Sequence, residues 1–198
     1  MAEVGIIDRD ENLELLRGLV VEKHTPGYLR LFSVDEYEAM IDAGILYSGE
    51  PVELLQGEII KTAAVGNRHA ACVDRINSLL SRKVGENAIV RVQSPIRLPD
   101  GTEPEPDVAL LKSRDDYYES GHPEPEDVLL IVEVADSSIA PDRDRKIPDY
   151  AARAIPEVWL VDLPGDNVAV YHEPAPAGGG YDTMRRLRRG DGVQSEHV

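Results

Sequence analysis

The amino-acid sequence predicts a mixed α/β or α+β fold, in which a β-sheet is sandwiched by helices. Helix-like and strand-like hydrophobic patterns follow one another in the order helix, several strands, helix and further strands. Two continuous apolar runs, DVALLK (107–112) and DVLLIVEV (127–134), are typical of strands covered on both faces. Hydrophobic residues make up 42% of the 198 residues and charged residues 29%, which suits one globular domain.

The first predicted helix begins after Ser33. Ser33 and Glu36 have the spacing of a capping box, in which the Ser hydroxyl and the Glu carboxylate bind backbone amides at a helix start. Gly44 is expected to end this helix, because glycine readily adopts the conformation that follows a helix C-terminus. Residues 52–62 then predict two short strands joined by a Gln-Gly turn.

An amphipathic helix is predicted between residues 67 and 84. Its apolar residues recur every three or four positions and therefore share one face of a helix. Gly85 is expected to close it. In residues 88–98, apolar residues alternate with polar ones, which is the pattern of a half-exposed strand. The residues of the helical stripe are Val73, Ile76, Leu80 and Val84.

The last part of the chain predicts one helix and three strands. Residues 141–154 are expected to form the helix, with Pro148 either in its first turn or at a kink. Residues 157–163 and 167–173 predict a hairpin around a Pro-Gly-Asp turn, and 181–187 a final strand.

The expected domain organisation is an N-terminal arm over residues 1–30, one domain over 31–190 and a polar tail over 191–198. The arm shows no clear periodicity, and we expect it to be loosely attached or to form a dimer contact. The sequence contains no apolar run long enough to span a membrane, and charges interrupt its start where a signal peptide needs an apolar stretch. We therefore expect a cytoplasmic protein. The single cysteine, Cys72, excludes an internal disulfide and a cysteine-based zinc site.

The formal net charge of −16 weighs against a protein that binds nucleic acid, because phosphate backbones are usually held by clustered Lys and Arg. A local basic surface can nevertheless exist on an acidic protein, and divalent metal can neutralise acidic side chains at a site. Two segments supply such a surface in the sequence: one with Arg143, Arg145, Lys146 and Arg153, and one with Arg185, Arg186, Arg188 and Arg189.

A candidate metal site is formed by Asp107 at the head of one buried strand, Glu133 near the end of the next, and Lys146 in the following helix. Neighbouring strands would bring the two carboxylates together. Two adjacent carboxylates repel unless a cation or a proton lies between them. Mg²⁺ binds one or two carboxylates, keeps several waters and leaves positions for phosphate oxygens. This pattern points to phosphodiester hydrolysis, with Lys146 as a fixed positive charge near the phosphate.

Further candidates are the backbone carbonyl of Val134 as a metal ligand and Glu58, on the early hairpin, as a metal or water contact. His69, at the start of the second helix, could bind phosphate or metal. Each residue also has an ordinary interpretation: carboxylates at strand ends are often solvated caps, a helix lysine is usually on the surface, and a histidine at a helix start is usually structural. No Walker loop, GxGxxG, HExxH or paired CxxC motif is present.

Over residues 31–181 the chain resembles the Uma-two family of bacterial restriction endonuclease-like proteins, within the PD-(D/E)XK nuclease superfamily. The resemblance lies in several segments that occur in a specific order: VELLQGEII, NRHAACVDRINSLL, VQSPIRL, EPEPDVALL, DVLLIVEVADSS and DRDRKIPDYAARAIPEVWLVDL. It implies a restriction endonuclease-like core with an additional N-terminal segment, Asp107 as the PD aspartate and Glu133 as the second acid. The superfamily lysine would fall at Ala135, so the resemblance implies that Lys146 replaces it from the next helix.

The leading hypothesis is a Mg²⁺-dependent DNA endonuclease, with Mn²⁺ as a possible substitute metal. Because two sites related by a two-fold axis conveniently cut both strands of a duplex, we also expect a homodimer. A second hypothesis is a non-catalytic module on a nuclease fold that binds nucleic acid or protein, which the acidic balance favours. A third is a metal-dependent phosphodiesterase that acts on RNA or nucleotides.

Overall fold

The computed structural model describes residues 13–16, 19–22, 30–47, 49–62, 65–136 and 142–195, and the chain forms two compact units. The first unit comprises residues 1–63 and 99–103, and the second comprises residues 64–98 and 104–198. The boundaries expected at residues 30 and 190 stay a prediction. No helix in the described part of the chain is long and apolar enough to cross a membrane.

The first unit contains one helix and two antiparallel hairpins. The helix is capped as predicted, because the Ser33 hydroxyl accepts a hydrogen bond from the Glu36 amide and the Glu36 carboxylate accepts one from the Ser33 amide. Buried Val34, Tyr37 and Leu54 form a small core of this unit. Its elements are β1 (Leu13–Leu16), β2 (Leu19–Glu22), α1 (Val34–Asp42), β3 (Val52–Leu55) and β4 (Glu58–Lys61).

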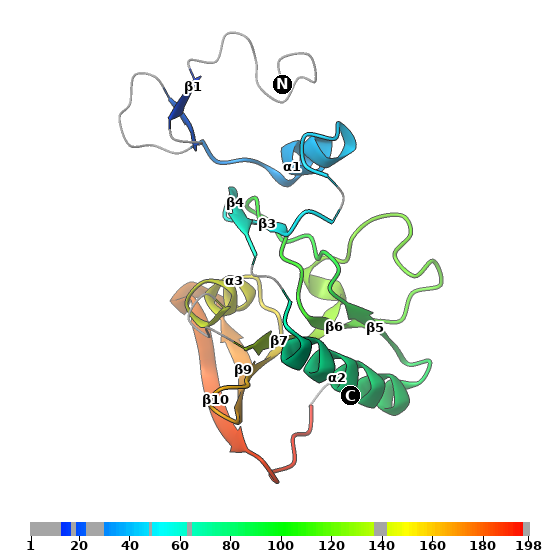
Figure 1. Cartoon of the computed structure of the whole chain (residues 1–198). Helices are drawn as coiled ribbons and strands as arrows, with labels where there is room; N and C mark the ends of the chain where they lie inside the picture. The colour runs from blue at the N-terminus through cyan, green and yellow to red at the C-terminus, as the bar shows by residue number, and fades with distance from the viewer. Residues whose placement is uncertain are drawn as a thin grey trace. The chain divides into compact units, whose positions relative to one another are not determined.

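The second unit is built on a six-stranded sheet with the order β10-β9-β8-β7-β6-β5 (Figure 1). Only β7 and β8 pair in parallel, and the other neighbouring pairs are antiparallel. The sheet is therefore mixed, as predicted. Its strands are β5 (Ala88–Val92), β6 (Val108–Lys112), β7 (Val128–Ala135), β8 (Glu157–Asp162), β9 (Asn167–Ala175) and β10 (Gly180–Arg188).

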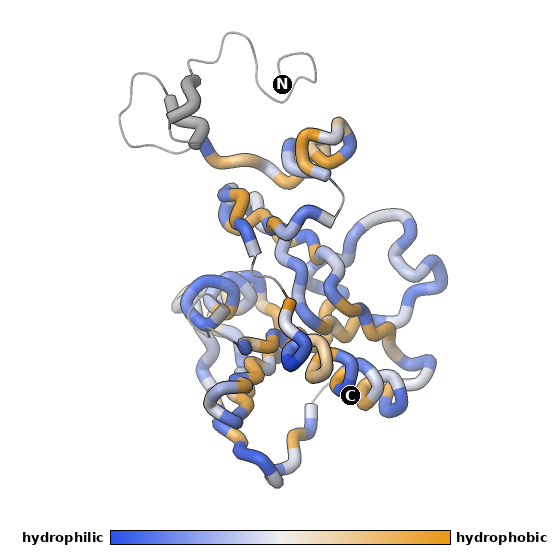
Figure 2. Tube along the Cα trace, viewed as in Figure 1, coloured by the Kyte–Doolittle hydropathy of each residue, from blue (hydrophilic) through white to orange (hydrophobic). Residues whose placement is uncertain are grey.

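Two apolar clusters cover the two faces of this sheet. On one face, α2 (Asn67–Val84) buries Val73, Leu80 and Val84 against Val132 and Trp159. On the other face, α3 (Ile147–Ala152) buries Ile147 and Tyr150, which belong to a second apolar cluster. Because successive side chains of a strand point to opposite faces, Leu130, Val132 and Val134 of β7 join the α2 cluster, whereas Ile131 and Ala135 join the α3 cluster. Figure 2 shows that hydrophobic residues predominate along the central strands.

The connection from β7 to β8 carries the helix predicted for residues 141–154. It begins with a π-helical turn, η2 (Asp142–Lys146), and continues as α3, with Pro148 in the first turn of α3. Parallel strands need such a crossover, because a tight turn can join only antiparallel neighbours. The crossover places η2 and α3 beside the buried end of β7, where Glu133 lies.

The strand predicted over residues 88–98 is longer than the strand in the structure. We expected a strand over residues 88–98, but β5 ends at Val92. Gln93 takes a left-handed conformation (φ 44°), which a regular strand cannot accommodate, and its amide donates to the carbonyl of Asp107. The apolar residues beyond this point, Ile96 and Leu98, are still buried. The alternation of polar and apolar residues beyond Val92 therefore reflects burial of the apolar side chains and not a regular strand.

Candidate metal centre

Asp107 lies immediately before β6 and is fixed by the neighbouring strand. Its Oδ2 accepts a hydrogen bond of 2.8 Å from the backbone amide of Val134 in β7. The same oxygen lies 3.0 Å from Nε2 of His69, at the start of α2. The side chains of Asp107 and His69 are each 13% exposed. The Asp107 carboxylate is thus held in a defined orientation between a strand and a helix.

Glu133 is the buried acid of this site, with a residue exposure of 2%. β6 and β7 pair Val108 with Val132, so the next position along the ladder sets Asp107 opposite Glu133. Oε1 of Glu133 accepts a hydrogen bond of 2.6 Å from the hydroxyl of Tyr150 in α3. A carboxylate this deep needs such partners, because an isolated buried charge is strongly unfavourable.

Lys146 supplies positive charge at the same carboxylate. Its Nζ lies 3.5 Å from Oε1 of Glu133, and its side chain is 11% exposed. Ala135, where the superfamily pattern places a lysine, is instead a buried member of the α3-side cluster. The ammonium group beside Glu133 therefore comes from η2 and not from β7.

The structure therefore brings together three of the residues singled out in the sequence: Asp107, Glu133 and Lys146. Val134 joins them through its amide, and the metal contact expected from its carbonyl stays a prediction. Glu58 lies in β4 of the first unit, so its contribution to this site also stays a prediction.

Two further side chains contact Asp107. His69 was considered as a phosphate or metal ligand, which stays a prediction, and the structure gives it a direct contact with Asp107. Gln93, which the sequence interpretation did not single out, places its amide Nε2 3.4 Å from Oδ1. No local pattern could have revealed these contacts, because they join residues 38 and 14 positions apart. Gln93 lies opposite Asp107 because β5 and β6 pair Val92 with Val108 and the next residues follow the same register.

The chemistry of this donor set fits a hard divalent cation. Carboxylate oxygens are the ligands that Mg²⁺ and Mn²⁺ prefer. Oδ2 of Asp107 is occupied by an amide and a histidine, whereas the contact of Oδ1 with Gln93, at 3.4 Å, is at the weak end for a hydrogen bond. Asp107 thus presents one weakly engaged carboxylate oxygen. A cation bound there would also reduce the repulsion between the two acids.

Replacing Tyr150 by phenylalanine is expected to lower the free energy of unfolding by about 1.5–3 kcal/mol, because its hydroxyl donates to a charged, buried carboxylate. Tyr118→Phe is a matched control: Tyr118 is also buried, but its hydroxyl donates to the backbone carbonyl of Lys112. That loss should be smaller, about 0.5–1.5 kcal/mol. Urea unfolding of the two variants measures both values, and equal losses would show that the bond to Glu133 has no special weight.

Comparison with known proteins identifies the relatives of this chain. Residues 34–198 match the model of the Uma2 family, described as "Putative restriction endonuclease". The chain belongs to this family. The match covers α1, both hairpin strands that follow it and the whole sheet of the second unit. The family resemblance seen in the sequence is thereby confirmed. No curated protein matches this chain.

A solved structure supports the same fold. The chain is similar to a crystal structure from Anabaena variabilis, described as a "putative nuclease", with a TM-score of 0.62 and 18% sequence identity. The similarity covers 82% of this chain and 88% of that one. The restriction endonuclease-like fold predicted for this Uma2 protein, a mixed sheet flanked by helices, is therefore confirmed.

Proposed function

We propose that this Uma2 protein is a metal-dependent DNA endonuclease, with Mg²⁺ or Mn²⁺ bound by Asp107 and Glu133. The observation that carries the proposal is the meeting of these two acids with the ammonium of Lys146 at one end of the sheet. Family and fold support a nuclease in general terms. DNA as the substrate and the identity of the metal are the proposed refinements.

Each residue has a separate role in this proposal. A divalent cation, when bound, polarises a phosphoryl oxygen and lowers the pKa of a bound water. The amide of Val134 and the ring of His69 hold Oδ2 of Asp107, which orients the other oxygen. The hydroxyl of Tyr150 holds Glu133, so this acid needs little reorganisation. The ammonium of Lys146 stabilises negative charge that develops on the phosphate or orients the attacking water.

A second function is a module on the nuclease fold that binds nucleic acid or protein without cutting, and the net charge of −16 favours protein as its partner. Such a module has no need of a bound cation, whereas the endonuclease does. A phosphodiesterase acting on RNA or nucleotides would use the same metal chemistry on another substrate. Homodimerisation remains part of the endonuclease proposal, because paired sites cut both strands of a duplex.

The deciding experiment incubates the protein with supercoiled plasmid, single-stranded DNA, RNA and a small phosphodiester, in Mg²⁺, in Mn²⁺ and in excess chelator. We expect cleavage of DNA with either metal and none with chelator. Preferential cleavage of RNA or the small diester would support the phosphodiesterase. Calorimetric titration with Mg²⁺ and Mn²⁺ runs in parallel. Absence of both cleavage and metal binding would favour the non-catalytic module.

A further inference from the structure

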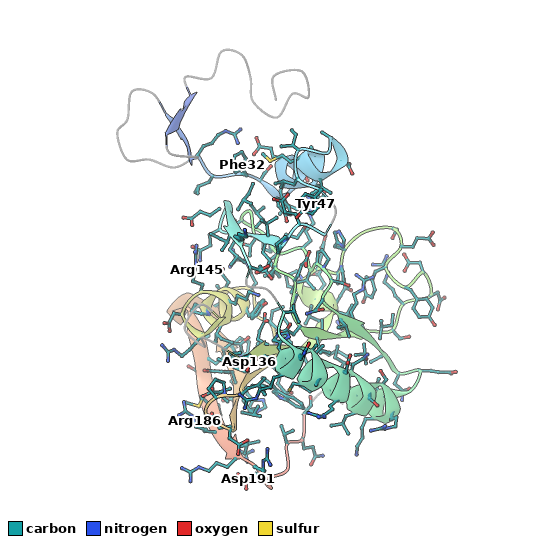
Figure 3. The ribbon with its side chains drawn as sticks, in the orientation of Figure 1. Phe32, Tyr47, Asp136, Arg145, Arg186 and Asp191 are labelled. Atoms are coloured by element: carbon teal, nitrogen blue, oxygen red, sulfur yellow. The ribbon has the colours of Figure 1, made fainter. Side chains whose placement is uncertain are left out.

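The two basic segments of this acidic chain both contact α3 in the second unit. One segment is η2, which carries Arg143 three residues before Lys146. The other is β10, at the edge of the sheet, which ends in Arg185, Arg186 and Arg188. Figure 3 labels Arg145 of η2 and Arg186 of β10, and both lie on the side of this unit where α3 and β10 pack together.

The pairing of β10 with β9 separates its arginines by face. Arg186 pairs with Ala169, which belongs to the apolar cluster under α3. Arg188 lies two residues further and therefore points to the same side. Leu187 pairs with Val168, and both pack on the opposite, α2-side cluster. The α3-side face of β10 thus presents two arginines, both of them exposed.

Arg185 and Arg189 are the other two cations of this segment. Arg185 pairs with Val170, a member of the α2-side cluster, so it projects from the opposite face. Arg189 follows the end of β10 and forms an exposed ion pair of 3.4 Å with Asp166. One short segment therefore carries two arginines on the α3 side and two arginines in different surroundings.

Tyr171 of β9 links η2 to the α3-side arginines. Burial raises the pKa of the Tyr171 hydroxyl, whereas Arg186 and Arg143 both act to lower it and Asp144 acts to raise it. The geometry agrees, because η2 and β10 both contact α3, and Tyr171 packs against the same cluster as Ala169, the partner of Arg186. Arg143 is exposed and donates two hydrogen bonds to Asp144, at 2.7 and 3.0 Å, in an ion pair that solvent screens.

We infer that the exposed face formed by Arg143, Arg186 and Arg188 binds the phosphate backbone of the nucleic acid that the adjoining site acts on. This inference rests on the proposed nuclease function. A chain with a net charge of −16 repels a polyanion over most of its surface, so binding requires a local group of cations. The face adjoins the candidate metal centre through η2, since this single turn contributes both Arg143 and Lys146.

The partner of this face is a phosphate chain and not an acidic protein segment. Arginine guanidinium groups match phosphate oxygens with two parallel hydrogen bonds, and a regular row on a strand suits a regularly repeating anion. Contacts with the backbone position a nucleic acid without reading its sequence. We therefore expect binding that depends strongly on salt and weakly on base sequence.

The test uses two double variants of the full chain, Arg186→Gln with Arg188→Gln and, as control, Arg185→Gln with Arg189→Gln. Both remove two positive charges from the same exposed segment, so they change the net charge equally. The probe is a fluorescent DNA duplex with sulfate-free buffer and Ca²⁺, and fluorescence anisotropy is measured over a range of salt concentrations. Plasmid cleavage in Mg²⁺ is measured on the same preparations.

We expect the α3-face variant to bind the duplex about tenfold or more weakly than wild type and to show a log–log salt slope smaller by about 2, since each lost phosphate contact removes about 0.9. The control should retain wild-type affinity within about twofold. Equal weakening of both variants, or no weakening of either, would overturn the inference. Absence of duplex binding by the wild type would overturn it as well, whereas the proposed nuclease function is decided separately by plasmid cleavage.

Discussion

Replacing Asp107 by asparagine is expected to lower the rate of metal-dependent DNA cleavage by about a thousandfold or more, because a metal contributes several kcal/mol of transition-state stabilisation. Asparagine keeps the shape of the side chain, and its amide oxygen can still accept the hydrogen bond from Val134 that fixes residue 107. It loses the negative charge that attracts the cation. The expected defect is therefore in metal binding and catalysis, with little change in the fold.

The control for this variant is Asp136→Asn, which removes the same charge at the residue after β7. Asp136 has a 3.4 Å contact with Arg68 and no place in the proposed metal site. Cleavage rates, metal titration calorimetry and thermal unfolding are compared for both variants. If Asp107→Asn cuts DNA as fast as wild type while remaining folded, Asp107 is not a metal ligand. If both variants lose cleavage equally, the effect comes from general loss of charge.

The elements that follow from local patterns were predictable from the sequence. The capping box at Ser33 depends only on two side chains in one turn, and the structure contains it. The helix predicted over residues 67–84 has the bounds of α2, because an apolar stripe runs from Val73 to Val84 and glycines flank the helix at both ends. The two apolar runs became β6 and β7 to within one residue, since a strand buried on both faces needs apolar residues at every position.

The features that the sequence did not reveal depend on contacts between distant segments. β1 and β2 are short strands in a segment whose sequence shows no alternation of polar and apolar residues. Each is defined by its antiparallel pairing with the other. The end of β5 follows from the left-handed conformation of Gln93, which the alternating sequence pattern did not indicate. The hydroxyl of Tyr150 donates a hydrogen bond to Glu133, a residue 17 positions away in the sequence. Such contacts are set by the register of the sheet.

The two acids of the candidate site were predictable from the sequence, whereas the residues that contact them were less so. An acid at the head of one buried strand and another near the end of the next must approach each other when the strands are neighbours, and β6 and β7 are neighbours. The helix that carries Lys146 was predicted from the residues, whereas its replacement of the expected lysine at position 135 came from the family resemblance, because spacing alone does not say which face of a helix a lysine occupies. The histidine beside Asp107 required the packing of α2 on the sheet.

Replacing Lys146 by methionine is expected to lower the maximal rate of DNA cleavage by about a hundredfold to a thousandfold, as expected for loss of one group that stabilises transition-state charge. Methionine keeps the apolar stem of a side chain that is only 11% exposed. Lys83→Met, on an exposed residue of the last turn of α2, changes the net charge equally and should leave the rate unchanged.

Two roles of Lys146 predict different responses to metal concentration. If Lys146 only neutralises Glu133, from which its Nζ lies 3.5 Å away, a saturating cation would replace that charge and restore cleavage. If it acts on the phosphate or the attacking water, the maximal rate stays low at every metal concentration. The second outcome is the one we expect, because the site then keeps its metal and lacks only the ammonium. Cleavage by Lys146→Met measured across a Mg²⁺ titration therefore separates a residue that organises the metal site from one that acts on the reacting atoms.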